Sequence, residues 1–369
     1  MAEFHSLMDY ATRQTKLAAA LSPAGVEALL VTHLPNIRYL CGFSGTAGVL
    51  LVTGGGRRSK CIFYTDGRYT QQAGEEVKGA KLVITKKAAF TEACAALSRT
   101  RQKVLGFEAD HLSYAAHRQL TQTLRGRVRL KAVAGCVEDM RLCKDQEEIG
   151  QIRASALVAA SLFQAALGAI RPGVSENLVA GEMELQARRA GADKMSFDTI
   201  VSAGRRSALP HGRASAQPVP GNGFIILDWG VILAGYCSDM TRTVHVGPVS
   251  AAHRRMYEAV RAAQLASIEA VRPGVTAGEV DRMGRDLLTK AGYGAYFTHS
   301  TGHGVGLEVH EAPKLAKDQS LKLAPGMVVT IEPGIYIPDE GGVRIEDMVL
   351  VTESGREVLT PTTKDLITL

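Results

Sequence analysis

An internal repeat in the second half of the chain limits the possible folds more than any other feature of the sequence. The segment AIRPGVS at residues 169–175 returns as AVRPGVT at residues 270–276, and a long Ala-rich stretch precedes each copy. Each copy opens a predicted helix, with Ser175 or Thr276 as the N-cap, and Glu279 completes a capping box in the second. Two similar halves related by a pseudo-twofold axis are therefore expected.

The repeat continues into the strands that follow these helices. GNGFIILDWG resembles APGMVVTIEPG, so Asp228 and Glu332 occupy equivalent positions, and each is followed by a second carboxylate, Asp239 or Glu346. Burying a carboxylate is costly unless a cation compensates its charge. No lysine or arginine recurs beside all four acids, so the sequence predicts divalent metal ions between the two halves.

A histidine breaks the symmetry of the repeat. His303 lies in STGHGVG, where the flanking glycines permit close approach of the backbone. A lone histidine is more often structural, but beside four acids without cations we interpret His303 as a fifth ligand. An oxygen-rich site with one imidazole suits Mn²⁺, Co²⁺ or Fe²⁺ better than a thiolate zinc site does. Two such ions activate water and polarise a carbonyl, which predicts hydrolysis of an amide or a related bond.

Three further polar residues accompany these motifs. His211 lies between Leu-Pro and a glycine, His310 follows His303 by seven residues, and Arg344 precedes Glu346 by two. On a strand, Arg344 and Glu346 would point to the same face, so Arg344 is expected to orient a ligand carboxylate. A hydrogen-bonded loop histidine or a surface arginine is the ordinary alternative for each.

The length of 369 residues predicts two domains, because single cores rarely exceed about 250–300 residues. The first part alternates strand-like and helix-like runs, which is typical of an α/β domain. Its predicted strands are 26–32, 48–53, 60–66, 81–85 and 103–108, and its predicted helices are 68–77, 91–100 and 114–124. The glycines Gly54–Gly56 are interpreted as a hairpin turn, since a phosphate loop would open a helix.

A charged stretch at 137–152 marks the predicted domain boundary, which gives domains 1–137 and 138–369. The helix that follows is expected to run to about Ile170 and to place Glu147, Glu148 and Arg153 on its solvated side.

Composition excludes several classes of protein. The net charge of +6 is spread along the chain without a basic run, so nucleic-acid binding is not favoured. Six cysteines without a CxxC pair indicate free thiols in a reducing compartment. The sequence shows no apolar run near the roughly 20 residues of a membrane span, so a soluble cytoplasmic protein is expected.

Taken together, the motifs resemble the successive signatures of the proline-specific metallopeptidases of the pita-bread fold, aminopeptidase P and prolidase of peptidase family M24. The segments that carry the resemblance are SFDTIVSAGRRSALPHG, LDWGVILAGYCSDMTRT, STGHGVGLEVHEAP and IEPGIYIPDEGGVRIED. HLPNIRYLCGFSGTAGVLLV and MRLCKDQEEIGQIR are also similar to that group. The resemblance implies a creatinase/prolidase-like α/β domain followed by an α+β pita-bread catalytic domain.

For the site, the resemblance implies two divalent ions, most often Mn²⁺, with Co²⁺ or Zn²⁺ as alternatives. The implied ligands are Asp228, Asp239, His303, Glu332 and Glu346. Glu332 would also take the proton from the bridging water. His211 and His310 match histidines that stabilise the tetrahedral intermediate and shuttle protons, and His299 matches a histidine near the proline pocket.

The expected activity is removal of the residue before proline at a free N-terminus, that is, an Xaa-Pro aminopeptidase. The alternative is an Xaa-Pro dipeptidase, which must recognise the carboxylate of proline. Many prolidases carry an arginine for this in a long loop, whereas the loop APKLAKDQSLKLAPG here is short and contains only lysines. An inactive pita-bread binding module, a creatinase-like enzyme and a methionine aminopeptidase are weaker alternatives, because all five ligands and the N-terminal domain are present. A homodimer is expected, with the N-terminal domain of one subunit near the active-site mouth of the other.

Overall fold

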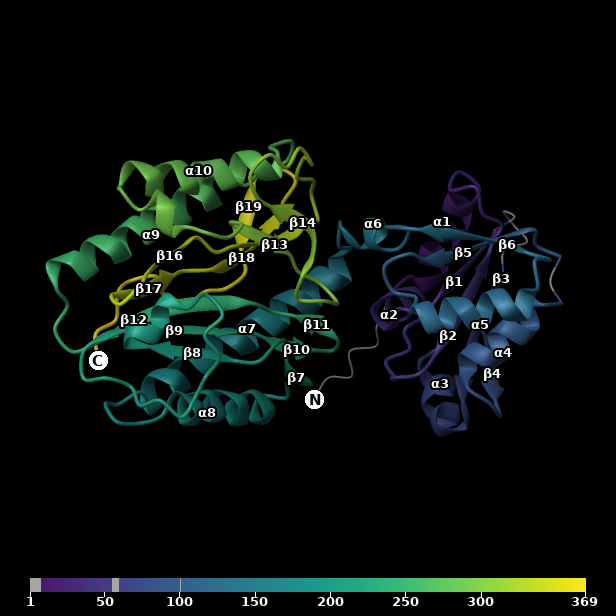
Figure 1. Ribbon diagram of the computed structural model, residues 1–369, viewed down its shortest axis with the longest axis horizontal. Helices are drawn as coiled ribbons and strands as arrows, with labels where there is room; N and C mark the ends of the chain where they lie inside the picture. The colour runs from purple at the N-terminus through teal and green to yellow at the C-terminus, as the bar shows by residue number, and fades with distance from the viewer. Residues whose placement is uncertain (1–7, 55–59, 100) are drawn as a thin grey trace. The chain divides into compact units, whose positions relative to one another are not determined.

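The computed structural model describes residues 8–54, 60–99 and 101–369, and the chain forms two compact units that divide between Arg141 and Leu142 (Figure 1). The elements of the first unit are α1 (Tyr10–Leu21), β1 (Ala28–Val31), α2 (Leu34–Cys41), β2 (Val49–Thr53), β3 (Lys60–Asp66), α3 (Thr70–Glu76), β4 (Lys81–Thr85), α4 (Ala89–Leu97), β5 (Val104–Glu108), α5 (Tyr114–Leu124), β6 (Arg129–Val133) and α6 (Glu138–Arg141).

The first unit is built on a mixed six-stranded sheet in the order β4-β3-β2-β1-β5-β6. The central strand β1 is buried along its whole length, as its unbroken apolar sequence ALLV requires. The predicted α/β domain is confirmed, although α1, α2 and β6 were not predicted. Strands β2 and β3 pair antiparallel, as a hairpin requires, but Gly55 and Gly56 of the predicted turn lie outside the described residues.

The second unit has an α+β architecture. Its elements are α7 (Gln146–Ala169), α8 (Glu176–Arg189), β7 (Lys194–Met195), β8 (Ile200–Ala203), η3 (Gly204–Ala208), β9 (Gly223–Trp229), β10 (Val231–Leu233), β11 (Tyr236–Cys237), β12 (Met240–Val246), α9 (Ala251–Ala270), α10 (Ala277–Lys290), η4 (Gly294–Tyr296), β13 (Gly302–Gly304), β14 (Glu311–Leu315), β15 (Val328–Ile331), β16 (Gly334–Ile337), β17 (Gly341–Arg344), β18 (Asp347–Val351) and β19 (Arg356–Val358). Figure 1 shows α8 on one side of the strands and α9 and α10 on the other.

The predicted repeat is present in the backbone of this unit. In the first half, α7 and α8 precede the sheet β12-β9-β8; in the second, α9 and α10 precede the sheet β14-β13-β15-β18-β19. The N–H of Gly173 donates to the carbonyl of Val219 at 2.9 Å, and the equivalent N–H of Gly274 donates to that of Leu323 at 2.8 Å. Thr276 and Glu279 form the predicted capping box.

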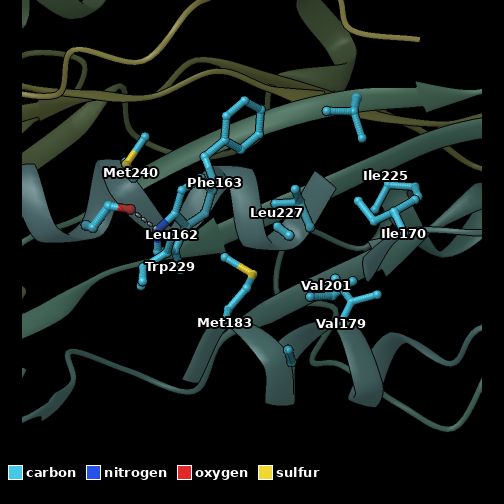
Figure 2. Close-up of a cluster of buried hydrophobic side chains, with 14 of the residues drawn as sticks. Leu162, Phe163, Ile170, Val179, Met183, Val201, Ile225, Leu227, Trp229 and Met240 are labelled. Atoms are coloured by element: carbon cyan, nitrogen blue, oxygen red, sulfur yellow. Dashed lines mark hydrogen bonds between the residues drawn. The ribbon is translucent and has the colours of Figure 1, made fainter. Parts of the chain in front are cut away.

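A buried apolar cluster joins α7 and α8 to the strands of the first half (Figure 2). Trp229 at the end of β9 is fully buried, stacks on Phe163, and donates its indole N–H to the carbonyl of Ala159 at 2.8 Å. The register of β9 is therefore set by an aromatic anchor one residue after Asp228.

Helix α7 differs from expectation in two ways. Glu148 is buried, because it completes the capping box at Asp145 and accepts a hydrogen bond from Tyr236 Oη, so its predicted solvated position was wrong. Within the described residues, α7 is also the one helix that is long and apolar enough to cross a membrane by length and composition. The core helix of a soluble protein passes the same test, and α7 packs against α8, β10 and β11.

Candidate metal centre

Two aspartates reach the centre from the first half. Asp228 lies on β9 opposite Thr241 of β12, and Asp239 directly precedes β12. The chain between them folds into the β10–β11 hairpin, whose turn needs left-handed backbone at Ala234 (φ 48°) and Gly235 (φ 82°). The antiparallel pairing of β9 with β12 then brings the two carboxylates to the same end of the sheet.

His303 and the two glutamates come from the second half. His303 is the middle residue of β13, between two glycines that leave no room for a side chain. A Cβ on Gly302 would lie 1.9 Å from the carbonyl oxygen of Thr330, and one on Gly304 would lie 2.1 Å from that of Ala312. These glycines therefore let β13 insert between β14 and β15 and place the imidazole beside Glu332, which follows β15.

The donor atoms of the two halves converge. Single ligand atoms of Asp239, His303 and Glu346 all lie within 4.8 Å of one another. His303 Nε2 is 3.6 Å from Asp239 Oδ2 and 3.4 Å from Glu332 Oε1. His303 Nδ1 lies 3.1 Å from the carbonyl of Gly304, which can only accept, so Nδ1 carries the proton and Nε2 has a free lone pair.

Asp228 completes the group but is held differently. Its Oδ2 accepts a hydrogen bond from Arg344 Nη2 at 2.6 Å, while its buried Oδ1 has no hydrogen-bond partner among the described residues. A buried carboxylate oxygen without a partner is costly in a folded protein. A cation in front of this oxygen would remove that cost.

Burial is the main cause of the pKa shifts of Asp239, Glu346, Glu332 and His303 in the centre. Burial, followed by repulsion from the other acids, raises the pKa of Asp239 and of Glu346 well above their ordinary values. Burial also raises the pKa of Glu332 to about 8 and lowers that of His303 to about 4. The site thus combines several carboxyl groups, which are unfavourable when ionised without a cation, with a neutral imidazole, and this is the donor set that a divalent cation binds.

Arg344 links this centre to a neighbouring polar wall. Besides Asp228, its guanidinium donates to Tyr336 Oη at 2.6 Å, to the carbonyl of Pro210 at 3.1 Å and to Thr241 Oγ1 at 3.2 Å. Tyr336 Oη also lies 3.0 Å from His299 Nε2. Burial, followed by the charge of Arg344, lowers the pKa of His299 to about 4, so this ring is neutral.

Two of these residues, Tyr336 and Thr241, were not among the predicted site residues. A Cβ on Gly334 would lie 2.5 Å from Tyr336 Oη, so a glycine at this position makes room for the phenol. Thr241 lies two residues after Asp239, and the strand period of two places both on one face. That spacing was a usable signal for Thr241, whereas the contact of Gly334 with Tyr336 depends on the fold.

The remaining two histidines lie on the exposed side of the centre. The ring of His310 packs edge-to-face on that of His303 at 4.4 Å between centroids. His211 is exposed and follows η3. Burial is the main cause that lowers the pKa of His310, as it is for His299. The structure therefore brings all of the predicted site residues into one region of the second unit.

Comparisons with known proteins agree with this geometry. Residues 150–353 match the model of metallopeptidase family M24, and residues 13–143 match the creatinase/prolidase N-terminal domain. The chain is 42% identical to the uncharacterized peptidase YqhT of Bacillus subtilis, over 96% of this chain and 99% of that protein.

Solved structures give the same result. An Xaa-Pro dipeptidase from Bacillus anthracis has a TM-score of 0.93 at 41% identity and covers 98% of this chain and 100% of its own. The prolidase from Pyrococcus horikoshii has a TM-score of 0.91 at 37% identity, covering 96% and 100%. An X-Pro aminopeptidase from Thermotoga maritima has a TM-score of 0.85 at 31% identity, covering 94% and 98%.

Proposed function

Because this chain belongs to metallopeptidase family M24, with the pita-bread fold predicted from its motifs, we propose that it is an Xaa-Pro dipeptidase. The family makes the chain a metal-dependent peptidase. Relatives named Xaa-Pro dipeptidase, such as that of Pyrococcus furiosus at 37% identity over 96% of this chain, support the dipeptidase over the aminopeptidase first expected. The short loop after His310 does not exclude this activity.

We assign Asp228, Asp239, His303, Glu332 and Glu346 as the ligands of two divalent ions, Mn²⁺ before Co²⁺ or Zn²⁺. The observation that carries this assignment is the convergence of acids from both halves on one buried imidazole. The unpartnered Oδ1 of Asp228 fits a cation in the same region. When bound, such ions lower the pKa of water and polarise the scissile carbonyl.

The protein's own side chains have separate roles in this proposal. Glu332, whose Oε1 lies 3.4 Å from His303 Nε2 in the centre, takes the proton from the attacking water. His211 and His310 donate hydrogen bonds to the oxygen on which negative charge develops, and His310 stands beside His303 for this. His299 and Tyr336 form a neutral wall that suits the apolar ring of proline.

A dipeptidase must also recognise the carboxylate of proline. We assign this role to Lys314, which is exposed on β14 four residues after His310. Its ammonium would pair with the carboxylate as a point charge, without the bidentate geometry of an arginine. Lys314→Met should raise KM for an Xaa-Pro dipeptide and leave KM for an Xaa-Pro amide unchanged, whereas Lys314→Arg should retain dipeptide binding.

The oligomer and the compartment are further parts of the proposal. All six cysteines are free, which supports a reducing cytoplasm. We infer a homodimer in which the N-terminal domain of one subunit limits access to the centre of the other. Sedimentation equilibrium that gives a fully active monomer at micromolar concentration would contradict this.

One comparison of substrates tests the proposed activity. The Mn²⁺-loaded protein should hydrolyse an Xaa-Pro dipeptide with a much higher kcat/KM than an Xaa-Pro-Yaa tripeptide, and chelator should abolish both activities. Equal kcat/KM values for the two would identify an aminopeptidase instead. Stoichiometric Mn²⁺ binding without turnover of either substrate would favour a binding module.

A further inference from the structure

A buried ion pair is formed by the two residues that directly follow Thr241 and the proposed ligand Glu346 in sequence. Arg242 of β12 donates from Nη2 to Asp347 Oδ1 of β18 at 2.7 Å, and the side chains are 1% and 0% exposed. The other donors of Arg242 go to four carbonyl oxygens, those of Thr241, Glu346, Thr362 and Thr363, at 2.5–2.9 Å. This arginine is thus bonded on every nitrogen.

Asp347 is satisfied just as fully. Its Oδ1 also accepts from Thr360 Oγ1 at 2.7 Å, and its Oδ2 accepts from Gln264 Nε2 at 2.7 Å and Lys364 Nζ at 2.8 Å. The pair therefore ties together β12, β18, helix α9 and the segment 360–364. A network of this kind holds its backbone in one arrangement, because any shift leaves a buried charge without partners.

The pair is coupled to the centre through the residues beside it. Thr241 and Glu346 each adjoin one member of the pair in sequence, and Thr241 Oγ1 donates to Glu346 Oε2 at 2.6 Å. The N–H of Glu346 also donates to the carbonyl of Thr241 at 3.1 Å. Arg242 Nη1 bonds to the carbonyls of both residues, so one nitrogen fixes the distance between the two strands where this ligand stands.

Each half of the unit supplies an arginine that pairs with an aspartate of the other half. Arg344 of the second half holds Asp228 of the first, and Arg242 of the first half holds Asp347 of the second. The first bond lies in the centre itself. The second lies behind it and touches no proposed ligand side chain.

We infer that Arg242 and Asp347 are positioning residues of the metal centre, which set its affinity for divalent ions by fixing Thr241 and Glu346 across the junction of the halves. The inference rests on the proposed metal site. It also implies that the segment 360–364, whose residues bond to the pair, affects metal binding. Outer partners of metal ligands typically change metal affinity about 10–100-fold when mutated.

The test is a calorimetric titration of the metal-free full-length protein with Mn²⁺, far below its melting temperature. Asp347→Asn should weaken Mn²⁺ binding about 10–100-fold. The double variant Arg242→Met/Asp347→Leu removes both charges, and replacing a buried ion pair by apolar residues is often neutral for stability. It should therefore regain part of the melting temperature lost in Asp347→Asn, although Thr360, Gln264 and the carbonyls lose partners. Mn²⁺ binding should stay weak, because the bonds to the carbonyls of Thr241 and Glu346 are lost. Recovery of both properties would show a merely structural pair and overturn the inference.

Arg206→Met is the matched control. It breaks the ion pair of Arg206 with the buried Glu176, whose other side-chain hydrogen bonds go to Ala203 and Ser215 and to none of the proposed ligands, and should leave Mn²⁺ affinity unchanged. If Asp347→Asn fails to fold, Lys364→Met is the substitute. The Lys364 side chain is 20% exposed, and its replacement removes one donor to Asp347, which should still weaken Mn²⁺ binding measurably. Unchanged Mn²⁺ affinity in the variant that folds would overturn the inference. Failure of the wild-type protein to bind Mn²⁺ or cleave an Xaa-Pro dipeptide would instead count against the proposed function.

Discussion

Glu346 and Asp347 are neighbours in sequence and almost equally buried, yet their surroundings differ completely. Asp347 accepts four hydrogen bonds, two of them from the cations Arg242 and Lys364. The side chain of Glu346 accepts one from Thr241 and faces the other acids of the centre, which, together with burial, raise its pKa.

The difference shows that this fold can neutralise a buried carboxylate with its own residues. It does so one residue away from the centre and leaves the acids of the centre short of cations. Arg344 holds Asp228, but Asp239 and Glu332 have no Lys or Arg ion-pair partner among the residues that the structure describes. A shortage confined to the centre is what an ion-binding site requires.

The largest effect is expected at Asp239, which belongs to the acids without a cation. Asp239→Ala should reduce Xaa-Pro hydrolysis by more than the roughly 100-fold that is the upper range for an outer partner of a ligand. The measurement is kcat/KM together with metal content. Near-normal turnover in this variant, with two ions still bound, would remove Asp239 from the ligand set.

The two neighbours should respond oppositely in the metal-free protein. Asp347→Asn breaks a satisfied pair and should lower the free energy of unfolding by about 3–5 kcal/mol. Glu346→Gln removes a carboxyl group that is unfavourably placed in the absence of metal, so at pH 8 it should leave that free energy unchanged or raise it. Denaturant titrations with chelator present measure both. Equal losses would mean that the contrast between the two acids does not exist.

His211 should affect the reaction and not the metal. A donor aimed at a developing oxyanion is worth about 2.7–4 kcal/mol, so His211→Ala should lower kcat by about 10²–10³. Metal content, measured by atomic emission, should stay normal, because His211 is exposed and lies outside the ligand motifs. Loss of metal in this variant would assign His211 to the ligands.

The smallest effect concerns pH. Burial raises the pKa of Glu332 from 4.5 to about 8 in the metal-free protein. The stability linked to its bound proton is complete below pH 4.5 and is lost as pH rises through about 8, and Asp239 and Glu346 shift in the same direction. The increase in melting temperature on adding a fixed Mn²⁺ concentration should therefore grow between pH 6 and pH 9. A constant increase across this range would contradict the pKa of Glu332.

Local patterns predicted much of the fold. Helix α5 begins and ends where its periodicity indicated, because Ser113 caps it and Arg125 ends it in left-handed backbone. The repeat predicted α8 and α10 because its Pro-Gly segments and N-caps act within a few residues. Helix α2 was missed, since LPNIRYLC has a proline at its start and only two turns to show a period.

The site likewise contains residues that local sequence patterns identify and residues that only the fold identifies. Its acids and His303 were predictable because each interrupts an apolar or glycine-rich motif. Arg242 and Asp347 were not singled out, because Arg242 bonds to Glu346, Asp347, Thr362 and Thr363 across 104 to 121 residues of sequence. Spacing within a motif carries no information about such distant pairs, and only the junction of the two halves brings them together.

The junction also fixes an order of events during synthesis. The first half leaves the ribosome with Asp228 and Asp239 but without His303, the two glutamates or Arg344, so a nascent chain holds only part of the ligand set. The supports of Asp347 emerge later still, up to Lys364. Because chains emerge at about 5–20 residues per second, the first half waits several seconds before its acids meet their partners. If the proposed ligands are correct, stable metal loading should therefore follow translation of both halves, because the first half supplies only Asp228 and Asp239.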